Sequence, residues 1–172
     1  MLQLCKVTKT LFISNARAAC SDELLQQEEV TLCINVSKQQ PFPSTNITKL
    51  QVPVYDDPTE DLYSHFDRCA DAIQKEANRG GRSVVYCKNG RSRSATICIA
   101  YLMKHRRLNL TDALQMGLDP DPPTTLRING IDNGWIIVVE WSVGSGSCMM
   151  GVLPQCMMGV PPAVSTYSSM TK

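Results

Sequence analysis

Residues 83–103 read SVVYCKNGRSRSATICIAYLM, and this stretch predicts how the rest of the chain is arranged. Residues 84–86 are β-branched or aromatic, which favours a buried strand. Residues 95–103 are apolar nearly all round, which is typical of a buried helix. A short cationic loop joins the two. The first N–H groups of a helix have no internal partner and the helix dipole is positive there, so this order predicts an anion site.

The composition of the loop favours phosphate as the anion. Gly90 lets the backbone adopt a conformation in which successive N–H groups converge on one ligand. No Lys followed by Ser or Thr comes after a second Gly, so the loop lacks the signature of a nucleoside-triphosphate site. We therefore expect a phosphate cradle whose binding residues are Lys88, Asn89, Gly90, Arg91, Ser92 and Arg93.

The entrance of the loop carries a candidate nucleophile, Cys87. Backbone N–H groups and a helix N-terminus stabilise a thiolate over a thiol. The planar guanidinium of Arg93 can hold two phosphate oxygens and follow them into the transition state. Ser94, at the expected N-cap, can hydrogen-bond the sulfur and help it to depart. A Cys-x5-Arg pair alone also fits a structural buried cysteine, but the strand, the loop and the helix around it favour catalysis.

Strands and helices alternate along the chain. Strands are expected at residues 10–14, 30–36 and 50–54, before the strand that leads to Cys87. A helix is expected from residue 61, because Leu62, Phe66, Cys69, Ile73 and Ala77 share one face, and Gly80-Gly81 ends it; a further helix should start at Thr111. This order predicts an α/β fold with a central, mostly parallel, twisted sheet flanked by helices. Ligands in such sheets bind at the carboxyl ends of strands, where Cys87 lies.

Composition narrows the class of protein. The 172 residues carry a net charge of +1, which gives no electrostatic reason to expect nucleic acid as a partner. Eight cysteines are scattered without paired metal-ligand spacing, and no secretory signal precedes them, so we expect free thiols, no metal, and a cytoplasmic or nuclear protein. No segment predicts membrane insertion. His65 is expected to be a packing or surface residue, and His105 to complement a helix dipole.

The segments LFISNARAA, VTLCINVS, VPVYDD, CKNGRSRS and CIAYLMKHRRLNLTDAL, within about residues 6–116, resemble the atypical dual-specificity branch of the cysteine-dependent protein phosphatases. The resemblance implies a catalytic domain over residues 1–116. It implies hydrolysis of phosphotyrosine and phosphoserine or phosphothreonine in phosphoproteins through a phosphocysteine, without metal or cofactor. In that family a general acid follows the strand before the helix, and the V-P-V-x-D spacing maps it onto Asp56. Asp57 is the alternative, and both could instead only cap the next helix.

Two departures leave alternatives open. The family usually has His immediately before the nucleophile, and Tyr86 stands here. The alternative function is therefore a phosphate-binding, pseudophosphatase-like interaction module with little turnover. Lys88 and Arg91 also make the loop more cationic than phosphotyrosine requires, which keeps a phosphoinositide substrate open. The sequence predicts no oligomeric state.

The resemblance ends after Met116. The family continues with helices that cover the sheet, and here Gly117 and three prolines in residues 120–123 interrupt the pattern. Residues 134–141 are strand-like with no evident partner, and the sequence CMMGV occurs twice after them. We therefore expect residues 117–172 to be a divergent, poorly ordered tail, the C-terminal helices to be missing, and the helix at residues 95–103 to be partly uncovered.

Overall fold

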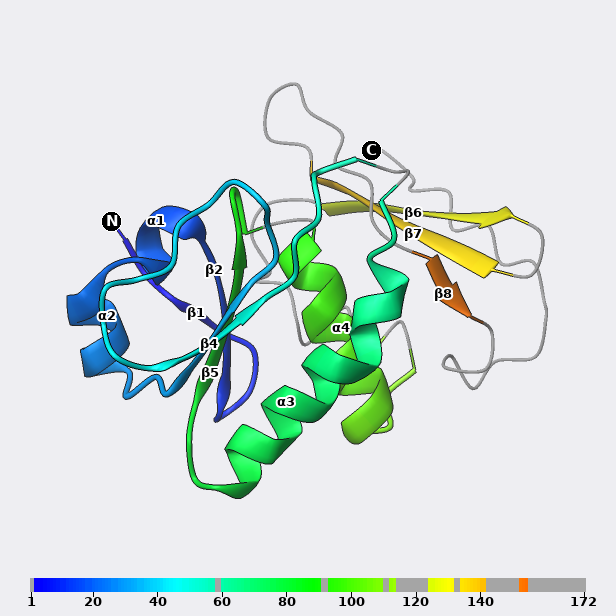
Figure 1. Cartoon of the computed structure of the whole chain (residues 1–172). Coiled ribbons are helices and arrows are strands. Elements are labelled where there is room, and N and C mark those ends of the chain that lie inside the picture. The colour runs from blue at the N-terminus through cyan, green and yellow to red at the C-terminus, as the bar shows by residue number, and fades with distance from the viewer. Residues whose placement is uncertain are drawn as a thin grey trace.

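A computed structural model of the chain describes residues 2–57, 60–90, 93–109 and 112–113, together with the strands of residues 124–131, 134–141 and 152–154. The first part contains a five-stranded sheet with the order β1-β2-β5-β3-β4 (Figure 1). All neighbours in it are parallel except β1 and β2. The elements are β1 (Cys5–Lys6), β2 (Leu11–Asn15), α1 (Ala16–Ala19), α2 (Asp22–Gln27), β3 (Leu32–Asn35), β4 (Thr48–Gln51), the 3-10 helix η1 (Tyr63–His65), α3 (Phe66–Asn78), β5 (Ser83–Cys87) and α4 (Arg93–His105).

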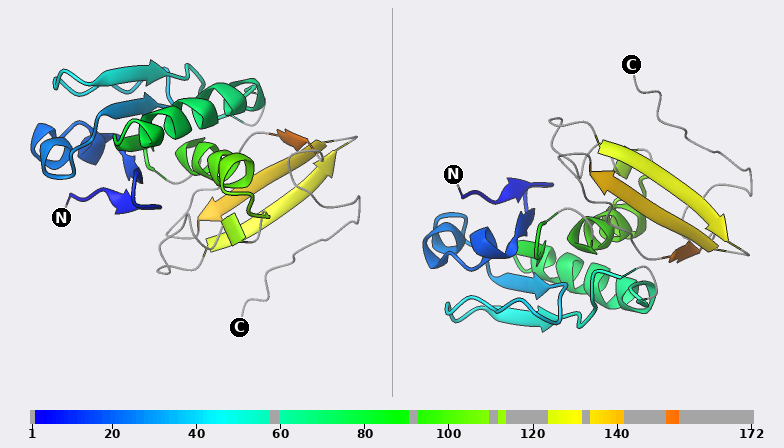
Figure 2. Two further views of the ribbon diagram at one scale, coloured as in Figure 1. Left: turned by 90° about the horizontal axis from the view of Figure 1, so that it is seen from below. Right: turned by 90° about the horizontal axis from the view of Figure 1, so that it is seen from above.

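Strand β5 is the centre of the sheet, as its apolar composition predicts. It pairs with β2 on one side and with β3 on the other, and all five of its residues are buried. Helices α1 and α2 cover one face of the sheet, and α3 and α4 cover the other (Figures 1 and 2). The α/β class with a mostly parallel, helix-flanked sheet is therefore confirmed.

The pleat of β5 divides its side chains between two cores. Val85 and Cys87 belong to the large core beneath α3 and α4. Val84 and Tyr86 belong to a smaller core with Phe12 and residues of α1 and α2. Successive side chains of a strand point to opposite faces, so two residues that are adjacent in sequence are separated by the thickness of the sheet.

Helix α3 has the amphipathic face that the sequence predicts, with Phe66, Cys69 and Ile73 buried. The α-helix begins later than expected: residues 63–65 form the 3-10 turn η1, and Asp61 precedes it and accepts a hydrogen bond from Ser64 N at 3.0 Å. The C-cap is Arg79, followed by Gly80 with φ +80°. Gly is favoured at this position because the left-handed conformation strains other residues.

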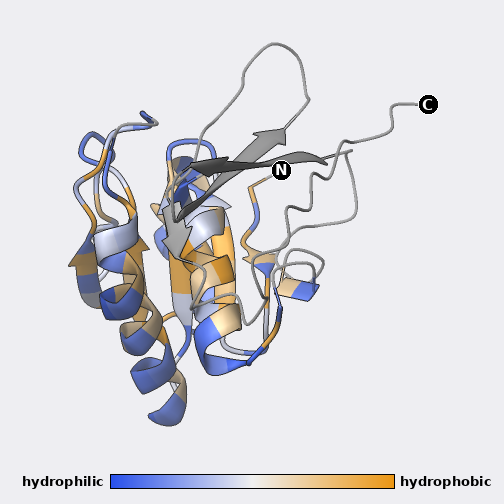
Figure 3. Cartoon of the chain, turned by 90° about the vertical axis from the view of Figure 1, so that its right-hand side faces the viewer, coloured by the Kyte–Doolittle hydropathy of each residue, from blue (hydrophilic) through white to orange (hydrophobic). Residues whose placement is uncertain are grey.

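Helix α4 is buried from Arg93 to Met103, as its composition predicts. Figure 3 shows it predominantly apolar, with hydrophilic residues at its C-terminal end. The expectation that part of this helix is uncovered is wrong for these residues, since each of them is buried. Figure 2 places strands β6 (Thr124–Ile131) and β7 (Gly134–Trp141) beyond α4 as seen from the five-stranded sheet.

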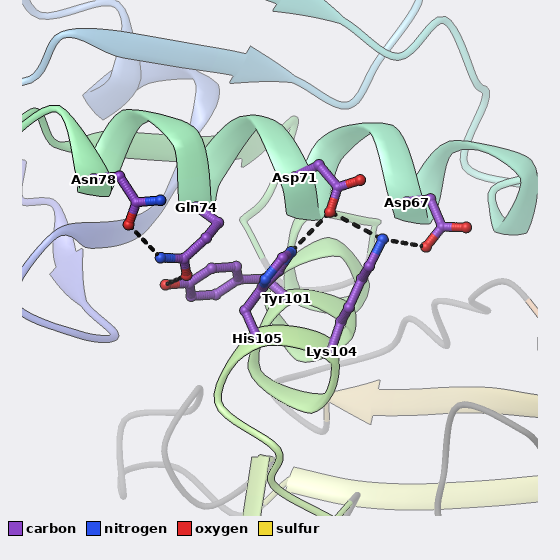
Figure 4. A network of polar contacts seen from close by, with 7 residues as sticks. All are labelled: Asp67, Asp71, Gln74, Asn78, Tyr101, Lys104 and His105. Atoms are coloured by element: carbon purple, nitrogen blue, oxygen red, sulfur yellow. Dashed lines mark hydrogen bonds and ion pairs between the residues drawn. The ribbon is translucent and has the colours of Figure 1, made fainter.

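A polar network joins the C-terminal end of α4 to α3 (Figure 4). Lys104 Nζ lies 2.8 Å from Asp67 Oδ1 and 2.9 Å from Asp71 Oδ1. His105 Nε2 lies 2.8 Å from the same oxygen of Asp71. His105 therefore has a carboxylate partner on the neighbouring helix in addition to the helix dipole. The pKa of Asp71 is lowered, chiefly by its hydrogen bond with Lys104, so this carboxylate stays charged.

Strand boundaries also differ from the prediction by one or more residues. The strand expected at residues 50–54 is β4, which ends at Gln51. Beyond it, the Val54 carbonyl accepts hydrogen bonds from Lys38 N and from the Arg93 side chain, so the backbone leaves the ladder. Thr111, where a further helix was expected to start, lies outside the described residues; next to it, Asn109 Oδ1 accepts a hydrogen bond from Asp112 N at 2.9 Å.

The described strands of the C-terminal part form a separate antiparallel sheet. They are β6 (Thr124–Ile131), β7 (Gly134–Trp141) and β8 (Val152–Pro154), in the order β6-β7-β8. The strand-like run at residues 134–141 therefore has partners on both sides, which lie in segments without an obvious strand pattern. The other residues expected in the poorly ordered tail lie outside the described residues, and that part of the expectation stays a prediction.

Candidate active site

The thiol of Cys87 lies at the carboxyl end of β5, in the middle of the sheet. Its residue is 2% exposed and packs in the core beneath α3 and α4. Cys87 Sγ is 3.3 Å from Ser94 Oγ, within hydrogen-bonding distance for sulfur. Ser94 lies in the first turn of α4, which begins at Arg93, so it was wrong to expect Ser94 at the N-cap. Either group can donate the hydrogen bond between the thiol and this hydroxyl.

The loop after Cys87 is held against the junction of β2 and α1. The Lys88 carbonyl accepts a hydrogen bond from Ala16 N at 3.3 Å. Gly90 has φ +70°, and a Cβ at this position would lie 2.6 Å from the carbonyl carbon of Ser14 and 2.7 Å from Asn15 N. Glycine is thus required here both by its backbone conformation and by the close approach of another strand.

Two further residues of the expected cradle are described. Lys88 and Asn89 are exposed, so both can reach a ligand from the solvent side of the loop. Arg91 and Ser92, also expected to bind substrate, lie outside the described residues.

The guanidinium of Arg93 is buried and is oriented by the segment that follows β4. Arg93 is 6% exposed, and its Nη1 donates a hydrogen bond to the Val54 carbonyl at 3.1 Å. Its Nε lies 3.5 Å from Asp56 Oδ1, an ion pair that is longer than a good hydrogen bond. A buried arginine positioned by a backbone carbonyl loses little side-chain entropy when it binds an oxyanion.

Of the two candidate acids, Asp56 is the one placed against the site. Its carboxylate contacts Arg93, and its side chain is 33% exposed, so it can meet both a bound phosphate and water. Asp57 is exposed. A phosphate on Arg93 would compete with the Asp56 carboxylate for the same guanidinium.

Tyr86 does not face the cradle. Its side chain is fully buried in the core on the α1 and α2 side, and its hydroxyl donates to the Pro41 carbonyl at 2.6 Å. Burial raises the pKa of Tyr86, with Cys33 and Cys20 adding to the effect, so the hydroxyl remains neutral. Tyr86, which stands where the family usually has His, therefore affects the packing of the core on the α1 and α2 side of β5.

The other described buried cysteines are unsuited to nucleophilic chemistry. Burial raises the pKa of Cys33 to about 12 and of Cys69 to about 11. Burial, followed by the proximity of Cys87, also raises the pKa of Cys98. The six described cysteines are free, as the sequence predicts. Cys33, Cys69 and Cys98, whose pKa is raised by burial, remain protonated near neutral pH.

Several residues around the site carry no signal that sequence reasoning used. The Val54 carbonyl orients Arg93, and a backbone atom has no pattern in the sequence. The backbone of Ser14 and Asn15 supports Gly90, although it lies far away in the chain. His65, expected to be a packing or surface residue, contacts Arg68 at 3.1 Å on the outer side of α3. Burial and then Arg68 lower the pKa of His65, which keeps it neutral.

Among the described residues there is no group of three His, Cys, Asp or Glu side chains that could hold a metal ion. The described helices also include none that is both long enough and apolar enough to cross a bilayer.

Comparison with known proteins agrees with this geometry. Residues 11–118 match the family model for the dual specificity phosphatase catalytic domain. Human dual specificity phosphatase 28 is 51% identical over 114 residues, which cover 66% of this chain and 65% of that protein. The mouse protein is 52% identical over 112 residues, covering 64% and 69%. The match thus spans just under two thirds of the human relative. The resemblance inferred from the sequence motifs is confirmed.

Solved structures give the same result. The crystal structure of human DUSP28 has a TM-score of 0.65 and 47% identity, covering 69% of this chain and 85% of that chain. A mouse putative dual specificity phosphatase complexed with zinc tungstate has a TM-score of 0.66 and 49% identity, covering 68% and 74%.

Proposed function

This chain belongs to the dual-specificity phosphatase family, and we propose that it hydrolyses phosphate monoesters on phosphoproteins, both phosphotyrosine and phosphoserine or phosphothreonine, through a phosphocysteine intermediate. The observation that carries the proposal is the placement of Cys87, Ser94 and Arg93. The thiol ends the central strand and contacts Ser94, and both Ser94 and Arg93 lie in the first turn of the following helix. The tungstate bound by the mouse relative is an oxyanion, in keeping with an oxyanion cradle in this family.

In the first step, the Cys87 thiolate attacks phosphorus. A P–S bond forms, the P–O bond to the substrate breaks, and the leaving oxygen takes a proton from Asp56. Arg93 and the N–H groups of the loop bind the non-bridging oxygens and stabilise their charge in the transition state. The contact between Asp56 and Arg93 in the resting site keeps the acid beside the position where phosphate binds.

In the second step, water attacks the phosphocysteine. The P–S bond breaks, the electron pair returns to sulfur, and Asp56 accepts a proton from the water. Ser94 Oγ, 3.3 Å from the sulfur, donates a hydrogen bond to the departing thiolate. Neither step requires a metal or a cofactor.

A second candidate function is phosphate binding with little turnover. It is favoured by Tyr86, which replaces the family's usual His and packs on the far side of the strand. In this case Cys87 and Arg93 would still bind a phosphorylated partner, but the phosphocysteine would form slowly.

The protein is further proposed to act in a reducing compartment, the cytoplasm or the nucleus. The free state of the described cysteines supports this, since disulfides persist mainly in oxidising compartments. The net charge of +1 supports phosphoproteins over nucleic acid as partners.

Hydrolysis of an aryl phosphate by the purified chain, with Cys87→Ser as the comparison, tests the proposal. Wild type should turn over and Cys87→Ser should not, and an acid quench should trap a labelled phosphoprotein whose label maps to Cys87. Equal rates in both proteins, or no hydrolysis and no trapped phosphate in either, would rule out the enzyme. Binding of a phosphopeptide without turnover would instead support the binding module.

Asp56→Asn and Asp57→Asn form a matched pair for the acid. Asp56→Asn should slow hydrolysis of an alkyl phosphate by ~10²–10⁴-fold and affect an activated aryl ester little, because a good leaving group needs no proton. Asp57→Asn should have a small effect on both substrates. The reverse ranking would assign the acid to Asp57.

A further inference from the structure

An exposed aromatic side chain and a lysine lie together at the rim of the site. Lys38 follows the carboxyl end of β3, and Tyr55 directly precedes Asp56 in the chain. The Lys38 ammonium stands 4.3 Å from the centroid of the Tyr55 ring. Tyr55 is 46% exposed, which is high for a large apolar side chain in the described part of the molecule. A cation held over a ring is positioned without being neutralised.

A single carbonyl connects this pair to the catalytic arginine. The Val54 carbonyl accepts from Lys38 N at 3.3 Å and from Arg93 Nη1 at 3.1 Å. Tyr55 is the next residue in the chain, and the one after it is Asp56, which contacts Arg93. Lys38 and Arg93 thus share one carbonyl acceptor, and Tyr55 is adjacent in sequence to Asp56. An extended peptide advances about 3.3–3.6 Å per residue, so this is the neighbourhood of a residue that flanks the phosphorylated one.

The charge of Lys38 is only weakly compensated. Its Nζ lies 3.9 Å from Glu60 Oε1, and the two side chains are 40% and 25% exposed. Half-exposed ion pairs of this length contribute little, because water screens them and the side chains remain mobile. A carboxylate from a substrate can therefore replace Glu60 as the partner of Lys38.

We propose that Lys38 and Tyr55 form a subsite for an acidic side chain next to the phosphorylated residue of a phosphopeptide. Lys38 pairs with the carboxylate, and Tyr55 holds the ammonium and provides a flat apolar surface for the peptide. This subsite rests on the proposed phosphatase function and gives its substrate class: phosphoproteins whose phosphorylated residue has Asp or Glu as a neighbour.

Peptide binding tests the subsite separately from turnover. Fluorescent phosphotyrosine peptides, with Glu or with Ala on both sides of the phosphorylated residue, are titrated by anisotropy onto the chain carrying Cys87→Ser. The Glu peptide should bind about three- to fivefold more tightly, the range expected of a partly exposed charge pair. In the Cys87→Ser background, Lys38→Met should reduce this ratio to about one, and Glu60→Gln should increase it, since it removes the competing carboxylate.

Lys75→Met is the matched control. Lys75 is an exposed lysine near the C-terminal end of α3, and its loss changes the net charge as the loss of Lys38 does. The preference for the Glu peptide should survive in this variant. It should disappear in about 1 M salt, where the screening length is about 3 Å.

The outcomes separate this inference from the function on which it rests. Hydrolysis of aryl phosphate decides the function, and the ratio of the two dissociation constants decides the subsite. Equal binding of the two peptides, or a preference that Lys75→Met reduces as much as Lys38→Met, would overturn the subsite. Tighter binding to phosphatidylcholine vesicles containing phosphoinositide than to the Glu peptide, with the same loss in Lys38→Met, would overturn it in favour of a lipid headgroup.

Discussion

Replacing Gly90 by Ala should damage both stability and catalysis, and Gly80→Ala gives the comparison that separates the causes. Both glycines have a positive φ, +70° and +80°. A Cβ on Gly80 would meet nothing within 4 Å, whereas a Cβ on Gly90 would lie 2.6–2.7 Å from backbone atoms of Ser14 and Asn15. Gly80→Ala carries only conformational strain. Gly90→Ala carries the same strain together with a backbone clash that no side-chain movement can relieve.

The expected magnitudes follow from these contacts. A left-handed conformation costs a non-glycine residue about 1–2 kcal/mol, so Gly80→Ala should lose that much free energy of unfolding. Relief of the clash at Gly90 requires the loop to move by roughly 0.7 Å, and overpacking of this kind costs about 1–3 kcal/mol more. For a chain of this length, each kcal/mol corresponds to about 2–4 °C in Tm.

Catalysis should respond more sharply than stability. A displacement approaching 1 Å in a site can cost about 10²-fold in rate, so kcat/KM of Gly90→Ala for aryl phosphate should fall by that order. Gly80→Ala, which lies before the amino end of β5 and away from the cradle, should remain close to wild type. Thermal melts and initial rates measured on the same preparations give both quantities. If Gly90→Ala is no less stable and no less active than Gly80→Ala, the close approach of the loop to β2 does not shape the cradle.

Three further results are expected. Asp22→Asn should reduce the loss of unfolding free energy at acid pH. Hydrogen bonds from Thr45 lower the Asp22 pKa from 3.8, so the Asp22 carboxylate stabilises the fold above that pH, and this contribution is lost as pH falls through the lower folded pKa. Urea titrations from about pH 6 to about pH 2 would contradict this if wild type and variant keep parallel curves. Tyr86→Phe should cost about 0.5–1.5 kcal/mol in urea unfolding, because the hydrogen bond to the Pro41 carbonyl is lost, while aryl phosphate hydrolysis stays near wild type; a large loss of activity would mean that the hydroxyl acts on the cradle. Iodoacetamide at neutral pH should modify Cys87, with protection by vanadate, and leave Cys33 unmodified, since burial raises the Cys33 pKa to about 12; peptide mapping that finds Cys33 modified equally would contradict the difference between the two thiols.

Local patterns predicted the parts of the site that lie close together in sequence. The apolar strand, the glycine and the apolar helix around Cys87 have the same order in the structure and in the prediction, because each is determined by its own composition. The amphipathic face of α3 was equally readable, since a period of 3.6 residues is a property of a single segment.

Contacts between distant segments were not predictable in this way. The Val54 carbonyl orients Arg93, and the β2–α1 junction supports Gly90. Both contacts depend on the order of strands in the sheet. Nothing in the local sequence specifies that order. The three-stranded C-terminal sheet was missed as well. Polar residues and a glycine, Arg127, Asn129 and Gly130, interrupt β6, whereas four consecutive β-branched residues made residues 134–141 strand-like.

The alternation of side chains along β5 also bears on how sequences of this kind can diverge. Tyr86 packs with Phe12 and Val84 on one side of the sheet, and Cys87 lies on the other. A substitution at position 86 is compensated by neighbours that never touch the substrate. The core on the α1 and α2 side of the sheet can therefore accept successive substitutions while the reacting groups keep their positions. A lineage can in this way adjust the rigidity of its catalytic strand from behind, in small steps, without a mutation in the cradle itself.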